Sequence, residues 1–277
     1  MASGSLNKIS RPEQEPEIVY ESAGFVVVNK PAGLQVHAAR IAGSAADPIR
    51  RPAAGRTGAM RTLADWLVAR YPEMRSVGDD PEFRPGIVHR LDKETSGILV
   101  AARTQAAFRY LKSLFEKREV RKTYLAVVRG VPKERRGVID APIGIRNGSL
   151  KRSVRSLKMA KEAVTEYRVL RTFAMPPSSP SAQPDAYSLL EVVPKTGRTH
   201  QIRVHLASIG HPVAGDRLYG PRAEASAKTA KAKAQPEGAF PRRLMLHALS
   251  LEFTAPDGER VKCETEPPEE FRDVIHK

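Results

Sequence analysis

Residues 85–102 read Pro-Gly-Ile-Val-His-Arg-Leu-Asp-Lys-Glu-Thr-Ser-Gly-Ile-Leu-Val-Ala-Ala. Two short apolar runs, Ile87-Val88 and Ile98-Leu99-Val100, enclose a dense block of polar residues. Apolar runs of this length are typical of strands, and polar side chains between two strands lie on a rigidly held loop. The stretch therefore predicts a site between two strands, with Asp92 as its most conspicuous member.

Further strand and helix patterns lie on both sides of this stretch. Apolar or alternating residues predict strands at 25–30, 120–128, 163–173, 186–194 and 244–253. Thr62 and Thr104 are predicted to cap helices, because apolar residues recur after each of them at helical spacing. Residues 199–209 also have helical spacing, which places Arg203 on a polar face beside the apolar one.

The order of these patterns predicts the domain organisation. Strand signals run from end to end without an internal repeat, which favours a single α+β domain over residues 17–277. Residues 1–16 lack apolar periodicity and are expected to form a flexible tail. Three stretches rich in Ala, Gly, Pro, Ser or Lys are expected to be loop insertions, at 38–61, 174–185 and 221–239.

The net charge of the chain indicates which class of molecule it binds. Among 277 residues, 46 Lys and Arg against 31 Asp and Glu give a net charge of +15, which favours a polyanion such as nucleic acid. No apolar stretch is long enough to span a bilayer, and the N-terminus does not resemble a secretory signal, so we expect a cytoplasmic protein without a membrane partner. Cys263 is the only cysteine, which excludes an intramolecular disulfide and favours a structural thiol.

Each polar residue also has an ordinary structural interpretation. Asp92 followed by Thr and Ser is typical of a turn or cap, Arg203 of a surface charge or a salt bridge, and Trp66 of a core side chain. His-Arg-Leu-Asp at 89–92 differs from the kinase order His-Arg-Asp-Leu, and no Gly-rich nucleotide loop precedes it. His89, His200, His205 and His211 have no metal-binding spacing, so we expect no metal site.

Four segments together carry a resemblance to a known family. They are Val-Asn-Lys-Pro-Ala-Gly-Leu-Gln-Val-His at 28–37, His-Arg-Leu-Asp-Lys-Glu-Thr-Ser-Gly at 89–97, Lys-Thr-Tyr-Leu-Ala-Val-Val-Arg-Gly at 122–130, and Thr-Gly-Arg-Thr-His-Gln-Ile-Arg-Val-His-Leu at 196–206, the last followed by Gly-His-Pro-Val-Ala-Gly-Asp at 210–216. In this order, over about residues 17–255, the chain resembles the RluA-like RNA pseudouridine synthases. Many larger relatives carry an RNA-binding module of the S4 type before this body, and the short tail has no room for one.

The resemblance implies a fold and a chemistry. The fold is that of the pseudouridine synthases, with a mixed, mainly antiparallel central sheet flanked by helices and loops. The reaction is the isomerisation of uridine to pseudouridine in ribosomal or transfer RNA, after the base has left the helix, and it needs no cofactor. Asp92 matches the essential aspartate, Arg203 is expected beside it, and Tyr124 is expected to stack on the uracil and to take part in proton transfer from C5.

The same resemblance, with the basic charge, predicts the contacts to RNA. The residues expected to bind it are Arg90, His89, Arg198, His200, Arg146, Lys151, Arg152 and Arg155. No protein partner is implied, and we expect a monomer. The alternative is an inactive RNA-binding or ribosome-assembly factor on the same fold, but loss of chemistry would relax Asp92, Tyr124 and Arg203, and all three match the family pattern.

Overall fold

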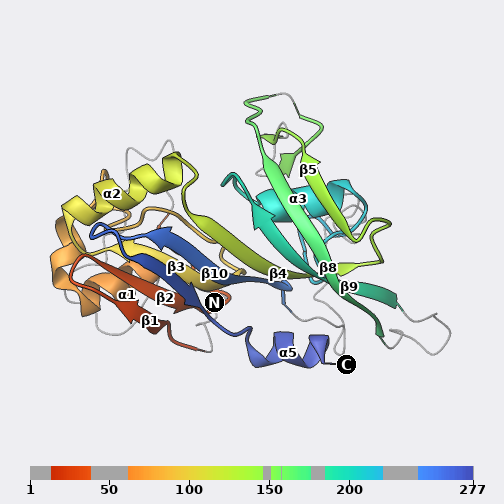
Figure 1. Cartoon of the computed structure of the whole chain (residues 1–277), viewed down its shortest axis with the longest axis horizontal. Helices are drawn as coiled ribbons and strands as arrows, with labels where there is room; N and C mark the ends of the chain where they lie inside the picture. The colour runs from red at the N-terminus through yellow and green to blue at the C-terminus, as the bar shows by residue number, and fades with distance from the viewer. Residues whose placement is uncertain are drawn as a thin grey trace, which may run out of the picture.

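A nine-stranded sheet runs through the chain in the computed structural model, which describes residues 14–38, 62–145, 151–156, 158–175, 185–220 and 243–276 (Figure 1). The spatial order is β1-β2-β3-β10-β4-β9-β8-β5, with β11 beside β10. Almost all of the predicted tail and of the three predicted insertions lies outside the described residues. The strands of the sheet are β1 (Glu17–Glu21), β2 (Phe25–Lys30), β3 (Ser96–Ala102), β4 (Arg121–Arg129), β5 (Arg136–Asp140), β8 (Val164–Met175), β9 (Asp185–Pro194), β10 (Leu246–Thr254) and β11 (Arg260–Glu264).

The pairing of the strands confirms the mixed, mainly antiparallel sheet. Among the described strands only β3 and β10 pair in parallel, and every other neighbouring pair is antiparallel. At the parallel pair the backbones approach closely at Gly97, which has φ of 112°. A Cβ at this position would lie 2.2 Å from the carbonyl oxygen of Ala248, so only glycine fits.

Four α-helices of the described chain lie against this sheet, and a short two-stranded ribbon stands beside it (Figure 1). Thr62 caps α1 through a capping box with Asp65, and Thr104 caps α2 by accepting a hydrogen bond from the amide of Ala107, as predicted from the sequence. None of the described helices is long and apolar enough to cross a membrane. The helices are α1 (Leu63–Arg70), α2 (Gln105–Glu116), α3 (Gln201–Ser208) and α5 (Glu269–Ile275), with a 3₁₀ turn η1 (Pro72–Ser76), and the ribbon is β6 (Gly144–Ile145) with β7 (Arg152–Ser153).

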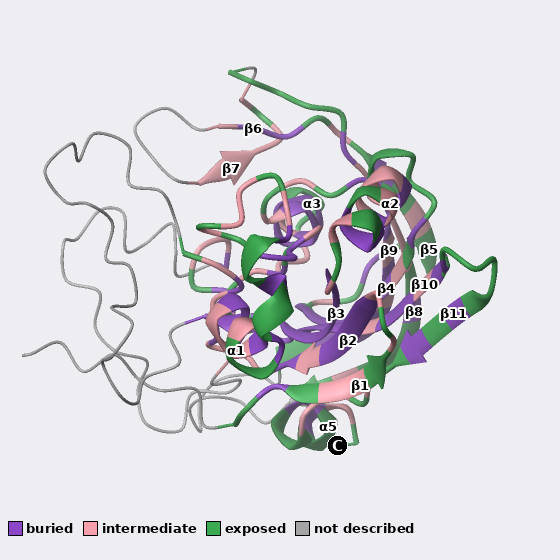
Figure 2. Cartoon of the chain, turned by 90° about the vertical axis from the view of Figure 1, so that its left-hand side faces the viewer, coloured by how far each residue is buried: buried purple, intermediate pink, exposed green. Residues whose placement is uncertain are grey.

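Two large apolar clusters form most of the core, one on each half of the sheet, and Ile143, Ala163 and Val204 form a small third one. The buried residues of the central strands are purple in Figure 2. In the first, Leu67 of α1 and Leu111 of α2 pack with residues of β2 and β3. In the second, Leu206 of α3 and Phe271 of α5 pack with residues of β4 and β9. Tyr124 of β4 contacts both clusters, so it lies where the two halves of the molecule meet.

The structure corrects two expectations for the polar segments. Ile87-Val88 does not form a strand, because Ile87 makes only an isolated bridge to Ala101 after a turn at Gly86, where φ is 68°. Arg203 is not a surface charge, one of the two ordinary interpretations of its position, since only 8% of its surface is exposed. Carboxylates from two other segments surround its guanidinium, and such pairing permits a buried cation that helical spacing alone assigns to the surface.

Candidate active site

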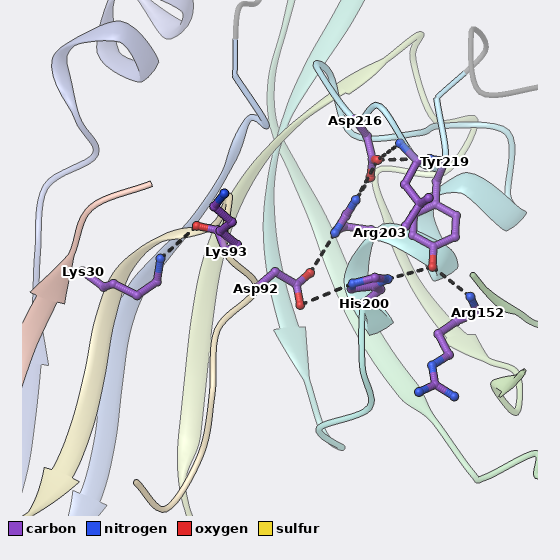
Figure 3. A network of polar contacts seen from close by, with 9 residues as sticks. Lys30, Asp92, Lys93, Arg152, His200, Arg203, Asp216 and Tyr219 are labelled. Carbon is purple, nitrogen blue, oxygen red and sulfur yellow. Dashed lines mark hydrogen bonds and ion pairs between the residues drawn. The ribbon is translucent and has the colours of Figure 1, made fainter. Parts of the chain in front are cut away.

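The loop that carries Asp92 is held in place by β2 (Figure 3). The ammonium group of Lys30, at the end of β2, is fully buried and donates to the carbonyl oxygens of Pro31, Leu34 and Lys93 at 2.8, 2.8 and 3.1 Å. The amide of Gly33 also donates to the carbonyl of Lys93, at 2.9 Å. These contacts fix the backbone directly after Asp92, and the fixed backbone holds the carboxylate in one orientation.

Arg203 joins Asp92 to a second, fully buried carboxylate. Its Nη1 lies 3.0 Å from Oδ2 of Asp92, and its Nε and Nη2 donate to the two oxygens of Asp216 at 2.7 and 2.9 Å. Burial by itself lowers the pKa of Arg203, but the hydrogen bonds and charges of Asp216 and Asp92 outweigh it and raise the pKa above its ordinary value. The bidentate contact with Asp216 leaves one edge of the guanidinium to face Asp92.

Asp216 is itself held by the backbone that follows it. Its Oδ1 accepts hydrogen bonds from the amides of Leu218 and Tyr219 at 2.8 and 3.0 Å. With the two bonds from Arg203, four donors converge on one carboxylate whose side chain is not exposed to solvent. Four donors fix the orientation of this carboxylate, so Asp216 is a rigid support for the guanidinium.

His200 and Tyr219 form a second arm of the same network (Figure 3). The Nε2 of His200 lies 3.8 Å from Oδ1 of Asp92, and its Nδ1 lies 2.9 Å from the hydroxyl of Tyr219. That hydroxyl accepts a hydrogen bond from the amide of Arg152 at 3.0 Å, so its own proton is available to Nδ1 of His200. Burial lowers the pKa of His200, which favours a neutral ring whose Nε2–H faces Asp92.

A cavity of about 610 Å³ opens beside this network. Asp92, Tyr124, His200 and Arg203 all line it, so the three residues predicted to be catalytic face one space. Tyr124 is half-buried, and burial together with the charge of Asp92 raises its pKa, which keeps the phenol protonated. The cavity is therefore a partly enclosed polar site with one carboxylate, one guanidinium and one aromatic ring.

The residues predicted to bind RNA are divided between this cavity and its surroundings. His89 and Arg90 both line the cavity, but His89 stacks on Phe115 with ring centroids 4.4 Å apart and accepts from the amide of Val100 at 3.1 Å. Burial and the charge of Lys122 lower the pKa of His89 to about 3, so its ring is neutral and supports the loop. Arg90 is exposed, with Nη1 lying 3.5 Å from Nε2 of His37.

The other predicted RNA contacts come from two segments. Arg198 lines the cavity, and its Nε donates to the carbonyl of Glu162 at 2.9 Å. Lys151, Arg152 and Arg155 lie at the ribbon β6–β7, where the backbone of Arg152 is tied to Tyr219. Arg146 lies outside the described residues.

Sequence reasoning assigned no role to four residues that build this site: Lys30, Lys122, Asp216 and Tyr219. Lys30, Lys122 and Asp216 lie inside the motifs that carried the resemblance, whereas Tyr219 follows the last of them. A lysine that ends a buried apolar run, as Lys30 does after Phe25–Val28, is a signal that one cation is held inside the fold.

Comparisons with known proteins agree with this geometry. The family model described as RNA pseudouridylate synthase matches residues 24–208. An RNA pseudouridine synthase of Aquifex aeolicus is 39% identical over 95% of this chain and 73% of its own length. The ribosomal large subunit pseudouridine synthase D of Pseudomonas aeruginosa is 39% identical over 93% of this chain and 70% of its own length.

A solved structure gives the same result at the level of the fold. The human RNA pseudouridylate synthase domain containing 1 protein superposes with a TM-score of 0.63 at 28% identity, covering 97% of this chain and 87% of that one. The chain therefore belongs to the RNA pseudouridylate synthase family and is an isomerase that acts on RNA.

Proposed function

We propose that this enzyme converts uridine to pseudouridine at Asp92. In this reaction the C1′–N1 bond breaks, the uracil turns, a C1′–C5 bond forms, C5 loses a proton and N1 gains one. Asp92 acts on the ribose, either by attack of its carboxylate on C1′ or by removal of a sugar proton. Both routes need the carboxylate to be held against the ribose, and the 3.0 Å contact with Arg203 orients it.

The remaining residues of the cavity have roles that follow from their environment. Tyr124 is proposed to stack on the uracil, because its ring lines the cavity that Asp92 faces. Since its raised pKa keeps the phenol protonated, Tyr124 is proposed to relay the proton: its hydroxyl gives up its own proton, which reaches N1 directly or through water, as it takes up the proton that leaves C5. Arg203 is proposed to hold the carboxylate in the orientation that Asp216 sets.

The position of Asp92 supports base flipping. Its side chain is only 18% exposed and lies at the side of a partly enclosed cavity, which a base stacked inside a helix cannot enter. Extruding a nucleotide costs a few kcal/mol, which contacts between basic residues and phosphates offset. Relatives named for the ribosomal large subunit make its RNA the first proposed substrate, with transfer RNA as the second.

The first prediction tests the chemistry. Incubation with a transcript of large-subunit ribosomal RNA is expected to yield pseudouridine, mapped by carbodiimide labelling and reverse transcription. Asp92→Asn keeps the size of the side chain but removes its charge, and it is expected to lower turnover by at least about a hundredfold. Asp257→Asn, in the exposed turn between β10 and β11, is the matched control and is expected to retain full turnover.

Two results would contradict the proposal. Full activity of Asp92→Asn would show that this carboxylate is not the catalytic group. A wild-type protein that binds ribosomal and transfer RNA but forms no pseudouridine in either would favour the inactive RNA-binding factor instead.

A further inference from the structure

The ammonium group of Lys122 faces the active-site cavity from β4. Lys122 precedes Tyr124 by two residues, and side chains at this spacing lie on the same face of a strand. Its Nζ donates weakly to the carbonyl of Thr196, at 3.4 Å. Gly197 lines the cavity beside it, and a Cβ at that position would lie 3.9 Å from the Nζ of Lys122.

Lys122 differs from most other cations around the cavity because no acidic residue within the described ranges pairs with it. Lys112, Arg118 and Lys195 also line the cavity, and each is paired with a carboxylate: Lys112 with Asp79 at 2.7 Å, Arg118 with Glu162 at 3.0 Å and Lys195 with Glu166 at 2.8 Å. No carboxylate of the described residues lies within 4.0 Å of the ammonium of Lys122. It is therefore a half-buried cation whose charge the fold leaves uncompensated.

A half-buried cation without a counter-charge lowers the stability of the folded protein. Burial lowers the pKa of Lys122 to about 8, so most molecules still carry the charge at neutral pH. Taking a charge out of water without a counter-charge disfavours the folded state. Buried charges without a partner in the protein are found where a ligand supplies the opposite charge. Lys122 lines the same cavity as Asp92.

The surroundings of Lys122 indicate which part of the RNA supplies that charge. Lys122 does not contact the network of Asp92, Arg203 and Asp216, where the ribose is proposed to lie. It also lines a second groove next to the cavity, whose other charged residues are Arg118, Glu119, Arg121, Glu166 and Lys195. A cation that stands apart from the reacting sugar, where the cavity meets this groove, fits the backbone of a strand better than it fits a base.

We propose that Lys122 binds a phosphate of the RNA strand next to the nucleotide whose base enters the cavity. This inference rests on the proposed function, since it assumes that a uridine is bound at Asp92. Lys122 is then a substrate-positioning residue, and the RNA phosphate provides the anion that the folded protein lacks.

The test measures equilibrium binding of a large-subunit ribosomal RNA transcript over a range of salt concentrations, in the Asp92→Asn background so that no reaction occurs. Adding Lys122→Met is expected to weaken binding roughly tenfold at low salt. It is also expected to reduce the slope of log affinity against log salt by about 0.7 to 0.9, the effect of one lost phosphate contact. Lys122→Arg keeps the charge and is expected to keep the slope.

Lys262→Met is the matched control. It removes the same charge from an exposed position of β11, where Lys262 pairs with Glu264, and the slope is expected to stay unchanged. Thermal unfolding gives an independent readout, because removal of an uncompensated buried charge is expected to raise the Tm of the RNA-free protein. A purely structural lysine would show the opposite change in Tm.

The outcomes separate this inference from the proposed function. Any of three results overturns the phosphate assignment. The salt slope is unchanged in Lys122→Met, it falls equally in Lys122→Arg, or it falls in Lys122→Met together with the Tm. With Asp92 intact, a fall in kcat at saturating RNA without a change in slope would place the ammonium on the base instead. A wild-type protein without turnover overturns the proposed function, while the salt slope still decides the role of Lys122.

Discussion

The buried ammonium group of Lys30 holds the loop that carries Asp92. Its ammonium is enclosed beneath the loop of Asp92, where three carbonyl oxygens accept its hydrogen bonds. Burial lowers its pKa to about 7, while the charges of Glu94 and Asp92 act in the opposite direction. Polar backbone groups that lie inside a fold must be paired, and one lysine satisfies three of them at once.

This environment predicts a pH dependence of stability. The pKa of Lys30 falls from 10.5 to about 7 on folding, so between these values the unfolded chain binds more protons than the folded one. The penalty for burying the charge is full below pH about 7, and it is relieved as the pH rises towards 10.5. The free energy of unfolding is therefore expected to rise with pH, by at most about 1.4 kcal/mol per pH unit from this group.

Urea unfolding of the wild type and of Lys30→Met measures this contribution. The difference in unfolding free energy between the two proteins is expected to shift in favour of the wild type as pH rises from about 7 to about 9. All other titrating groups are shared and cancel in the comparison. Parallel curves for the two proteins would show that Lys30 keeps its proton throughout this range.

At the scale of elements, the hydroxyl of Tyr219 links the ribbon β6–β7 to the active site. It accepts from the amide of Arg152 in β7 and contacts Nδ1 of His200, whose other nitrogen faces Asp92. His200 is the cap residue of α3 and has a left-handed backbone, with φ of 58°, so the helix begins at Gln201. The first residues of this helix line the cavity. One phenol thus connects a basic ribbon, a helix start and the proposed catalytic carboxylate.

Tyr219→Phe is expected to loosen the ribbon without unfolding the protein. The variant removes one acceptor of a backbone amide, which costs about 1–3 kcal/mol locally. Hydrogen exchange of the Arg152 amide is therefore expected to become faster, and KM for RNA to rise if the ribbon binds the strand. Tyr110→Phe, which removes a hydroxyl bonded to carbonyls near the end of β10, is the control and is expected to leave exchange in the ribbon unchanged. Unaltered exchange at Arg152 in Tyr219→Phe would show that the ribbon is held by other contacts.

For the whole molecule, the two apolar clusters share one sheet, and Tyr124 packs against both. The parallel pair β3–β10 and the antiparallel pair β10–β4 join the two halves by backbone hydrogen bonds. Opening either half would break pairing along the strands at the centre of the sheet. We therefore expect the chain to unfold as one cooperative unit, with the active site between the halves.

Substitutions in each cluster test this expectation by calorimetry. Leu67→Ala in α1 and Phe271→Ala in α5 each remove a fully buried side chain, at a cost of about 2–5 kcal/mol. Both are expected to lower the Tm of the same single transition. Val138→Ala, at an exposed position of β5, is expected to change stability by no more than about 0.5 kcal/mol. Two separate transitions, one shifted by each variant, would show that the halves unfold independently.

Local patterns predicted much of the architecture because each depends on neighbours in the chain. The caps at Thr62 and Thr104, the strand 25–30 and the strand 186–194 follow from spacing and side-chain type within a few residues. The strand expected at Ile87-Val88 failed for the same reason, since an apolar pair does not reveal that Gly86 turns the backbone before it.

The sequence by itself determined the family and the mainly antiparallel sheet, and it predicted Asp92 as the catalytic residue, because motifs in a fixed order carry that information along the chain. Only the tertiary structure decided that Arg203 is buried between Asp92 and Asp216, that Lys30 supports the loop of Asp92, and that no carboxylate in the described part of the chain pairs with Lys122. Pairing and burial of charges join residues far apart in sequence, such as Asp92 and Arg203, which are separated by 111 positions. The cost of each charge depends on this three-dimensional environment, which no local pattern records.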